Sequence, residues 1–126
     1  MRLPGCLMAL AVASLLGACQ AQSNALPEGV LGHWTTAAHR YEDRFFELDA
    51  DHLTFGTGGG SSYRNAILRI EVTEEEDGRP LYHIEHQGSE GQSYTFSFYY
   101  EPAEGGVIRL RNQTEIHWKK ERGSTR

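Results

Sequence analysis

Three side chains that could ligate a metal ion lie close together in the sequence, at His83, Glu85 and His86. Imidazole and carboxylate groups are common ligands of zinc and related ions. The flanking residues alternate in polarity, which predicts a β-strand, on which neighbouring residues point to opposite faces. His86 would then face away from the other two, and His117 would join them only from an adjacent strand. We therefore predict no metal site.

Other patterns typical of catalysis or cofactor binding are missing or incomplete. The acidic run 74–77 lacks the alternating ligands and the glycine of a calcium loop, which indicates a solvated hairpin tip. The glycine run 58–60 is not followed by the Gly-Lys-Ser/Thr sequence of a phosphate-binding loop. No convergent set of titratable groups can be named, so we expect no catalytic residue, no enzyme activity and no cofactor.

The N-terminus has the pattern of an export signal. Met1 and Arg2 give a short positive start, and an apolar run follows over residues 7–16. This run is too short to span a membrane, which takes about 20 apolar residues. We therefore expect a signal peptide over 1–18 and an exported mature protein.

The stretch Leu16, Gly17, Ala18, Cys19 resembles the lipobox of bacterial lipoproteins. The resemblance implies cleavage before Cys19 and a diacylated thioether on its sulfur. It also implies an anchor on the periplasmic face of a Gram-negative outer membrane, because Gln20 stands where aspartate usually signals inner-membrane retention. The alternative is an ordinary secretory signal with a soluble product.

The rest of the chain divides into a tether, one domain and a tail. Cys6 would leave with the signal peptide and Cys19 would carry lipid, so no thiol remains for a disulfide. We expect a lipidated cysteine and polar tether over 19–28, a β domain over 29–120 and a frayed tail over 121–126. The net charge of −5 argues against nucleic acid as a partner.

Period-two alternation dominates the predicted domain and indicates an all-β fold. We predict eight strands, at 31–36, 44–48, 52–55, 66–73, 81–86, 93–100, 108–111 and 115–119. Short turns between them favour an antiparallel up-and-down barrel, because eight strands are enough for a sheet to close. A β-sandwich and a curled open sheet are the alternatives.

The alternation also predicts which side chains face inward. The inward set is Trp34, Phe46, Leu48, Leu53, Phe55, Leu68, Ile70, Tyr82, Ile84, Tyr94, Phe96, Phe98, Ile108, Leu110, Ile116 and Trp118. Such bulky side chains can fill a barrel of this size. Buried tyrosine hydroxyls need partners, so Tyr82, Tyr94 and Tyr100 indicate the wetter end of the barrel.

The residues Gly32, His33 and Trp34 resemble the Gly-x-Trp pattern that opens the lipocalin and fatty-acid-binding barrels. The resemblance implies a lipocalin-like barrel that holds a small apolar ligand, with the tryptophan closing one end. It also implies a basic residue from a late strand stacked on that tryptophan, here Arg109 or Arg111. A second lipocalin motif and a C-terminal helix are lacking.

These patterns lead to two hypotheses about function, a ligand-binding module and a protein-interaction protein. The first is a non-catalytic, membrane-anchored binding module for a small apolar or amphipathic ligand. Its expected ligand-binding residues are Trp34, Tyr82, Tyr94, Phe96, Phe98 and Trp118. The second is a protein-interaction or inhibitor lipoprotein of the cell envelope with a filled barrel. In both, the lipid bilayer is a partner through acylated Cys19.

Overall fold

Alternating apolar and polar residues form the strands of this protein, since one face of each strand packs on a core. The computed structural model describes residues 26–121. In that range the helical elements are three short 3-10 turns, η1 (Glu28–Val30), η2 (His39–Tyr41) and η3 (Ala103–Gly105). The strands are β1 (Gly32–Thr36), β2 (Phe45–Leu48), β3 (His52–Gly58), β4 (Ser61–Glu74), β5 (Pro80–Gln87), β6 (Ser93–Glu101), β7 (Val107–Leu110) and β8 (Gln113–Lys120).

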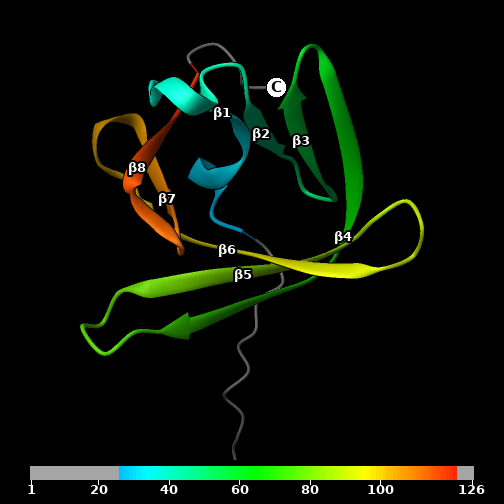
Figure 1. Ribbon diagram of the computed structural model, residues 1–126. Helices are drawn as coiled ribbons and strands as arrows, with labels where there is room; N and C mark the ends of the chain where they lie inside the picture. Colours follow the sequence, from blue (N-terminus) through cyan, green and yellow to red (C-terminus); the bar gives the residue numbers. More distant parts are fainter. Residues whose placement is uncertain (1–25, 122–126) are drawn as a thin grey trace, which may run out of the picture.

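Each strand pairs antiparallel with the next, and β8 pairs with β1 to close the sheet into a barrel (Figure 1). The closing register places Thr36 opposite Trp118 and Trp34 opposite Lys120. The predicted all-β class and the eight-stranded up-and-down barrel are therefore confirmed. The β-sandwich and the curled open sheet are excluded.

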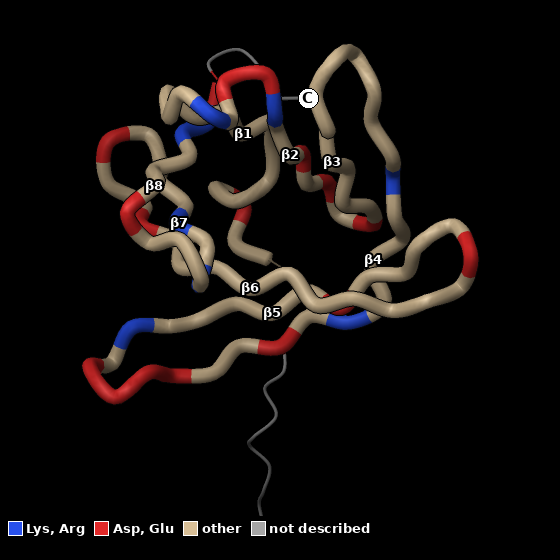
Figure 2. Tube along the Cα trace, viewed as in Figure 1, with Lys and Arg blue, Asp and Glu red and all other residues tan. Residues whose placement is uncertain are grey.

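The antiparallel order gives the barrel two unlike ends. The N-terminal segment with η1 lies at one end, together with the β2–β3, β4–β5 and β6–β7 turns; we call this the closed end. The β1–β2 segment with η2 lies at the other, with the β3–β4, β5–β6 and β7–β8 turns; we call this the mouth. Figure 2 shows the acidic run 74–77 as a red segment at the tip of the β4–β5 turn.

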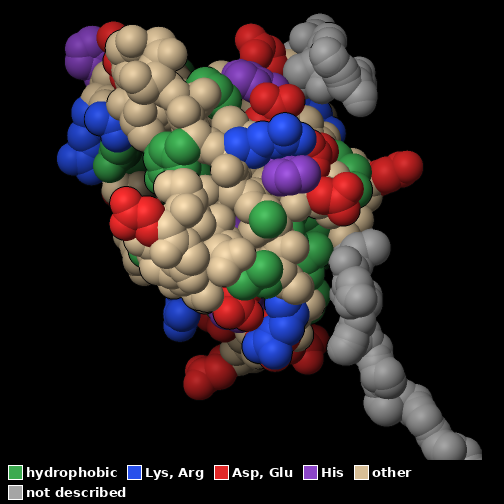
Figure 3. Space-filling view, turned by 90° about the vertical axis from the view of Figure 1, so that its right-hand side faces the viewer, with side chains coloured by type: hydrophobic (Ala, Val, Ile, Leu, Met, Phe, Trp, Pro, Cys, Tyr) green, Lys and Arg blue, Asp and Glu red, His purple; other side chains and the backbone are tan. Residues whose placement is uncertain are grey.

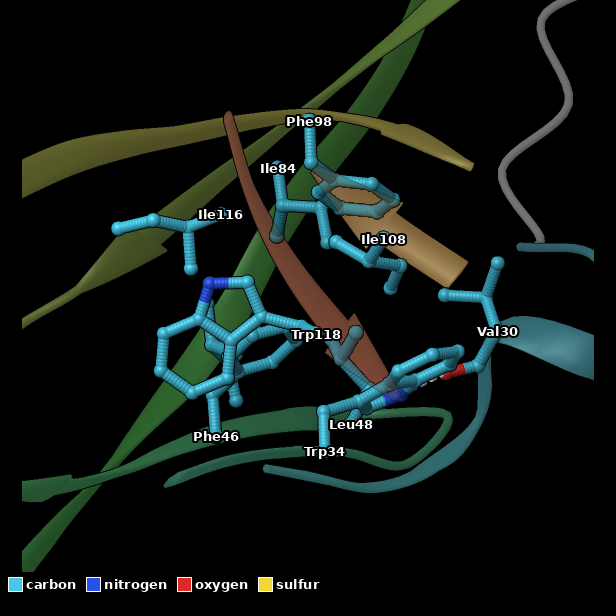
Figure 4. Close-up of a cluster of buried hydrophobic side chains, with 10 residues drawn as sticks. Val30, Trp34, Phe46, Leu48, Ile84, Phe98, Ile108, Ile116 and Trp118 are labelled. Carbon is cyan, nitrogen blue, oxygen red and sulfur yellow. Dashed lines mark hydrogen bonds between the residues drawn. The ribbon is translucent and has the colours of Figure 1, made fainter. Parts of the chain in front are cut away.

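The closed end is organised around Trp34, which is fully buried. Its indole N–H donates a 2.9 Å hydrogen bond to the carbonyl of Val30, which fixes η1 across the barrel (Figure 4). The basic side chain over the ring belongs to Lys120, whose Nζ lies 5.7 Å from the ring centroid. The expectation of Arg109 or Arg111 is therefore wrong. Alternation along β8 turns Lys120 toward the interior, whereas the two arginines occupy the outward positions of their strand.

Buried aromatic and aliphatic side chains fill the barrel interior (Figure 4). The buried cluster is Val30, Trp34, Phe46, Leu48, Leu53, Ile84, Phe98, Ile108, Ile116 and Trp118. All of these except Val30 belong to the predicted inward set. Phe55, Ile70, Tyr82, Phe96 and Leu110 pack against the cluster while remaining partly exposed. Most of the interior therefore follows from the alternation of the sequence.

Leu68 departs from the predicted inward set, because its side chain is 48% exposed. The pairing of β4 with β5 shifts between Ile67 and Arg69, so one extra residue enters β4 at this point. Such a bulge changes which residues face inward on its two sides. Ile67 packs against the core in place of Leu68, and beyond the bulge Ile70 does so.

The predicted glycine loop at 58–60 is a tight turn. Gly58 ends β3, and Gly59 and Gly60 turn the chain with φ of 65° and 85° before β4 begins at Ser61. Glycine adopts positive φ without the steric cost that other residues incur. The tight turn joins β3 to β4 at the mouth, so the end of β3 and the start of β4 form part of its wall.

Candidate functional site

An open pocket of about 560 Å³ lies at the mouth, between the ends of β3 and β4 and those of β5 and β6; we call it the mouth pocket. Its aromatic lining comes from Phe55, Tyr63, Tyr94 and Phe96. The Phe55 ring packs 5.6 Å from Tyr63 and meets Phe96 edge-on at 5.3 Å. Tyr63 and Tyr94 are each 51% exposed, so they form the rim. The pocket therefore has apolar walls open to solvent on one side.

A buried polar pair, Asn65 and His86, also lines the mouth pocket. The two residues are only 3% and 5% exposed. The amide nitrogen of Asn65 lies 2.9 Å from Nδ1 of His86. Since the amide donates, Nδ1 accepts, and the neutral ring carries its proton on Nε2. Nε2 has no hydrogen-bond partner within residues 26–121, so this proton is available to a ligand.

Burial controls the charge of this pair. Taking the imidazole out of water disfavours its charged form, so burial lowers the pKa of His86 from its ordinary value of 6.5. The His86 ring also packs against Phe55 at 5.6 Å and Tyr94 at 5.8 Å. At neutral pH the lining is thus an aromatic wall with an uncharged donor.

The remaining lining is polar or small and includes two charged residues, Arg64 and Glu90; the others are Gly88, Ser89, Gln92 and Thr95. The guanidinium of Arg64 is directed to the β2–β3 turn, 3.8 Å from the carboxylate of Asp49 and 3.2 Å from Nδ1 of His52. Glu90 lies in the β5–β6 turn and is exposed. Both charges remain in contact with solvent, so the pocket is apolar at its walls and polar at its edge.

The six expected ligand-binding residues occupy three places. Tyr94 and Phe96 line the mouth pocket. Trp34 and Phe98 are fully buried in the core, and Tyr82 is half-buried, stacked 5.5 Å from Phe98. Burial raises the pKa of Tyr82. The fold thus brings only two of the six to an open pocket.

Trp118, the last of the six, lies beneath the mouth with 5% exposure. Its indole N–H has no hydrogen-bond partner among residues 26–121. Figure 4 shows this nitrogen directed toward Ile116, which precedes Trp118 on β8 and is nearer the mouth. Tyr41 of η2 packs 6.2 Å from the Trp118 ring, and its hydroxyl accepts a 2.8 Å hydrogen bond from the Gln113 amide. The β1–β2 segment therefore covers this part of the mouth.

Sequence reasoning missed Asn65, Tyr63 and His86 as site residues. Alternation does place His86 opposite His83 and Glu85, on the inward face. Asn65 and Tyr63 precede the bulge at Leu68, so alternation counted backward from Ile70 assigns them to the outer face. Only the pairing of β4 with β5 reveals the bulge, so no signal in the sequence marked these two residues as inward-facing.

The residues considered as metal ligands have other partners. His83 contacts the hydroxyls of Ser97 at 2.8 Å and Thr73 at 2.9 Å, and the Glu85 carboxylate lies 3.7 Å from Arg69. His117 stands on β8, which is not a neighbour of β5, and contacts Arg109 at 2.8 Å. Residues 26–121 contain no group of three side chains that could hold a metal ion.

The acidic run at the β4–β5 turn is engaged in local contacts. The Tyr99 hydroxyl donates a 3.0 Å hydrogen bond to Glu75, and Asp77 forms a 2.8 Å ion pair with Arg79. The Arg79 guanidinium also lies 4.3 Å from the Tyr99 ring centroid. Tyr99 is consequently only 7% exposed, although it faces outward. These contacts fold the hairpin tip against the outer wall.

The predicted signal peptide 1–18, the lipid-bearing Cys19 and the tether up to residue 25 lie outside the described residues. The described chain starts at Leu26, which packs against the core ahead of the predicted domain boundary at Gly29. No helix in residues 26–121 is long and apolar enough to cross a membrane. Comparisons of the chain with protein-family models, with curated proteins and with solved structures find no match.

Proposed function

We propose that this protein is a non-catalytic binding module that holds a small apolar or amphipathic ligand in the mouth pocket. The observation that carries the proposal is an aromatic-walled pocket of about 560 Å³ with the buried Asn65–His86 pair in its lining. Small-molecule sites are typically concave, mostly apolar and equipped with a few placed polar groups. The mouth pocket is concave and combines an aromatic wall with placed polar groups, although about half of its lining is polar.

The filled interior limits where the ligand lies. Phe46 packs against both Phe96 and Trp118 at 5.1 Å, which leaves the space above these rings as the accessible part of the barrel. A flat apolar or aromatic ligand fits against Phe55 and Phe96. Its polar group would accept the Nε2 proton of His86, which is neutral at pH 7 because burial lowers its pKa.

We also propose that the protein is exported and anchored by acylated Cys19 on the periplasmic face of an outer membrane. The lipobox-like stretch from Leu16 to Cys19 and the apolar run before it support this proposal. The chain enters the barrel at the closed end through η1, opposite the mouth. A tether to the bilayer would therefore leave the mouth pocket facing away from the membrane surface. Fractionation of the wild type and of Cys19→Ser tests this anchor.

The ligand proposal is tested with N-phenyl-1-naphthylamine, a neutral aromatic probe whose fluorescence rises in apolar surroundings. We expect saturable binding that Tyr94→Ser weakens about tenfold, since loss of a stacked ring costs roughly 1–2 kcal/mol. Leu68→Ser is the matched control, because Leu68 is 48% exposed and Tyr94 51%. Equal binding by both variants would refute the mouth pocket as the site.

A protein-interaction or inhibitor lipoprotein of the cell envelope is the second candidate function, favoured by the filled interior. The surface that would contact a protein partner is less well defined than the mouth pocket. Figure 3 shows the side of the barrel nearest β3 and β4, where hydrophobic side chains form several small groups among charged ones. This second function would be favoured by two results together. The protein would show no saturable binding of N-phenyl-1-naphthylamine, and it would capture an envelope protein that the Leu68→Ser variant no longer captures.

A further inference from the structure

A second depression, of about 670 Å³, lies in the barrel wall below the β7–β8 turn; we call it the wall groove. It arises because β7 is short. β7 pairs with β6 only over Phe98 to Glu101. Beyond that pairing, one more backbone hydrogen bond of 3.1 Å joins the Arg111 N–H to the carbonyl of Ser97. The first residues of β6 therefore have no β7 partner, and the groove follows their free side.

The lining of the wall groove consists mainly of hydrogen-bond donors. It includes the hydroxyls of Thr95 and Ser97, the amides of Asn112 and Gln113, and the guanidinium of Arg111. The backbone N–H of Thr95 also points into the groove. On a β-strand, the backbone groups of residues two apart point to the same neighbouring strand, and the carbonyl of Ser97 already accepts a hydrogen bond from Arg111. No carboxylate lines the groove.

Arg111 is the free charge in this lining. Its guanidinium forms no ion pair or hydrogen bond within residues 26–121, in a chain whose net charge is −5. Across the sheet, Glu71 is paired with His83 and Glu85 with Thr95. Arg69 lies 3.8 Å from Glu71 and 3.7 Å from Glu85, so these two carboxylates share a cation of their own. The lining of the groove itself carries the positive charge of Arg111 and no carboxylate.

His83 fixes the hydroxyl beside Arg111. Ser97 faces His83 across β5 and β6, with 2.8 Å between Oγ and Nδ1, while Nε2 contacts Thr73 at 2.9 Å. His83, Ser97 and Arg111 therefore form a row across three strands. Both imidazole nitrogens are engaged with these hydroxyls, so the groups that remain for an oxyanion are the Arg111 guanidinium and the side chains of Thr95 and Asn112. A guanidinium can donate several charge-assisted hydrogen bonds to an oxyanion at once.

We propose that the wall groove binds the carboxylate or phosphate head of an amphipathic ligand whose apolar part occupies the mouth pocket. This inference rests on the proposed function. Thr95 and Phe96 line both depressions, so one strand separates them and a single molecule can extend over it. Charge on Arg111 holds the head group, and the aromatic wall holds the chain.

The test uses isothermal titration of the exported chain carrying Cys19→Ser, with dodecanoate, dodecyl phosphate, 1-dodecanol and inorganic phosphate as separate probes. We expect the two anionic amphiphiles to bind about tenfold more tightly than 1-dodecanol, the usual effect of one charge-assisted hydrogen bond. Arg111→Gln removes this preference, and Lys119→Gln, which removes an equal charge from the exposed face of β8, retains it.

Other outcomes separate the wall groove from the mouth pocket. Anions that bind no tighter than 1-dodecanol would overturn the proposal, and so would a loss of preference in both variants. Saturable 1-dodecanol binding without any anion preference would leave the mouth pocket intact and refute the groove. If 1-dodecanol fails to bind while inorganic phosphate binds the wild type and not Arg111→Gln, the mouth function fails and the anion site stands.

Discussion

The buried Asn65–His86 pair allows a double-mutant cycle that separates stability from function. Asn65→Leu leaves Nδ1 of His86 without its donor, and His86→Phe leaves the Asn65 amide without its acceptor. Each residue is at most 5% exposed, so each single variant strands a buried polar group at a cost of about 1–3 kcal/mol. In a domain of this size that corresponds to a fall in Tm of roughly 4–8 °C per kcal/mol.

The double variant removes both polar groups and should recover most of this loss, because replacing both partners with apolar groups is nearly neutral. Equilibrium unfolding in urea at pH 7.5 measures all four proteins. The Asn65–His86 pair is not a coupled buried pair if the two single costs simply add, or if the unfolding free energy of both single variants lies within about 0.5 kcal/mol of the wild type. An additive cycle would mean that the two side chains are not coupled.

The same cycle has a functional readout in two matched ligands, naphthalene and 1-naphthol. The wild type should prefer 1-naphthol about three- to tenfold, since its oxygen accepts the Nε2 proton of His86. The double variant should bind both equally. A preference for 1-naphthol that survives in the double variant would place the polar contact elsewhere.

Three more predictions concern stability. Burial lowers the pKa of His86, so as the pH falls below 6.5 the unfolded chain binds a proton before the folded chain does. The free energy of unfolding should therefore decline between pH 6.5 and the lower pKa of the folded state. Urea unfolding at pH 7.5 and pH 5.5 should show a smaller decline in His86→Phe than in the wild type. Gly56→Ala would drive its methyl group into the Phe45 ring, at a cost of about 1–3 kcal/mol in thermal unfolding; an unchanged Tm would contradict the packing. Trp34→Phe should cost about 1 kcal/mol more than Trp118→Phe, because only Trp34 donates an indole hydrogen bond; equal losses in urea would argue against that bond.

The sequence was sufficient to predict the barrel because its signal is local and repeated. In β6, Phe96 and Phe98 alternate with Thr95 and Ser97, and in the structure Phe98 lies in the buried cluster while Phe96 packs against it. Bulky residues at the inward positions must be buried, and the number of strands with short turns between them favoured a closed barrel over a sandwich. Alternation alone assigned nine of the ten residues in the buried cluster; Val30 lies in η1, where no strand periodicity applies.

The site could not be derived in the same way because it depends on register between strands. Asn65 and His86 are 21 residues apart, and only the bulge at Leu68 brings them together. One inserted residue exchanges the two faces of a strand, and nothing in the composition of β4 marks where the insertion falls. Lys120 over Trp34 depends likewise on how β8 closes against β1.

Changes in ¹H–¹⁵N chemical shifts during titration with N-phenyl-1-naphthylamine would show directly whether the mouth pocket holds a ligand. We predict saturable shifts concentrated at Phe55, Tyr63, Tyr94 and Phe96, with the closed end around Trp34 unaffected. Shifts centred on Trp34 would place the ligand at the closed end, and scattered shifts that do not saturate would mean that the mouth pocket is not a binding site.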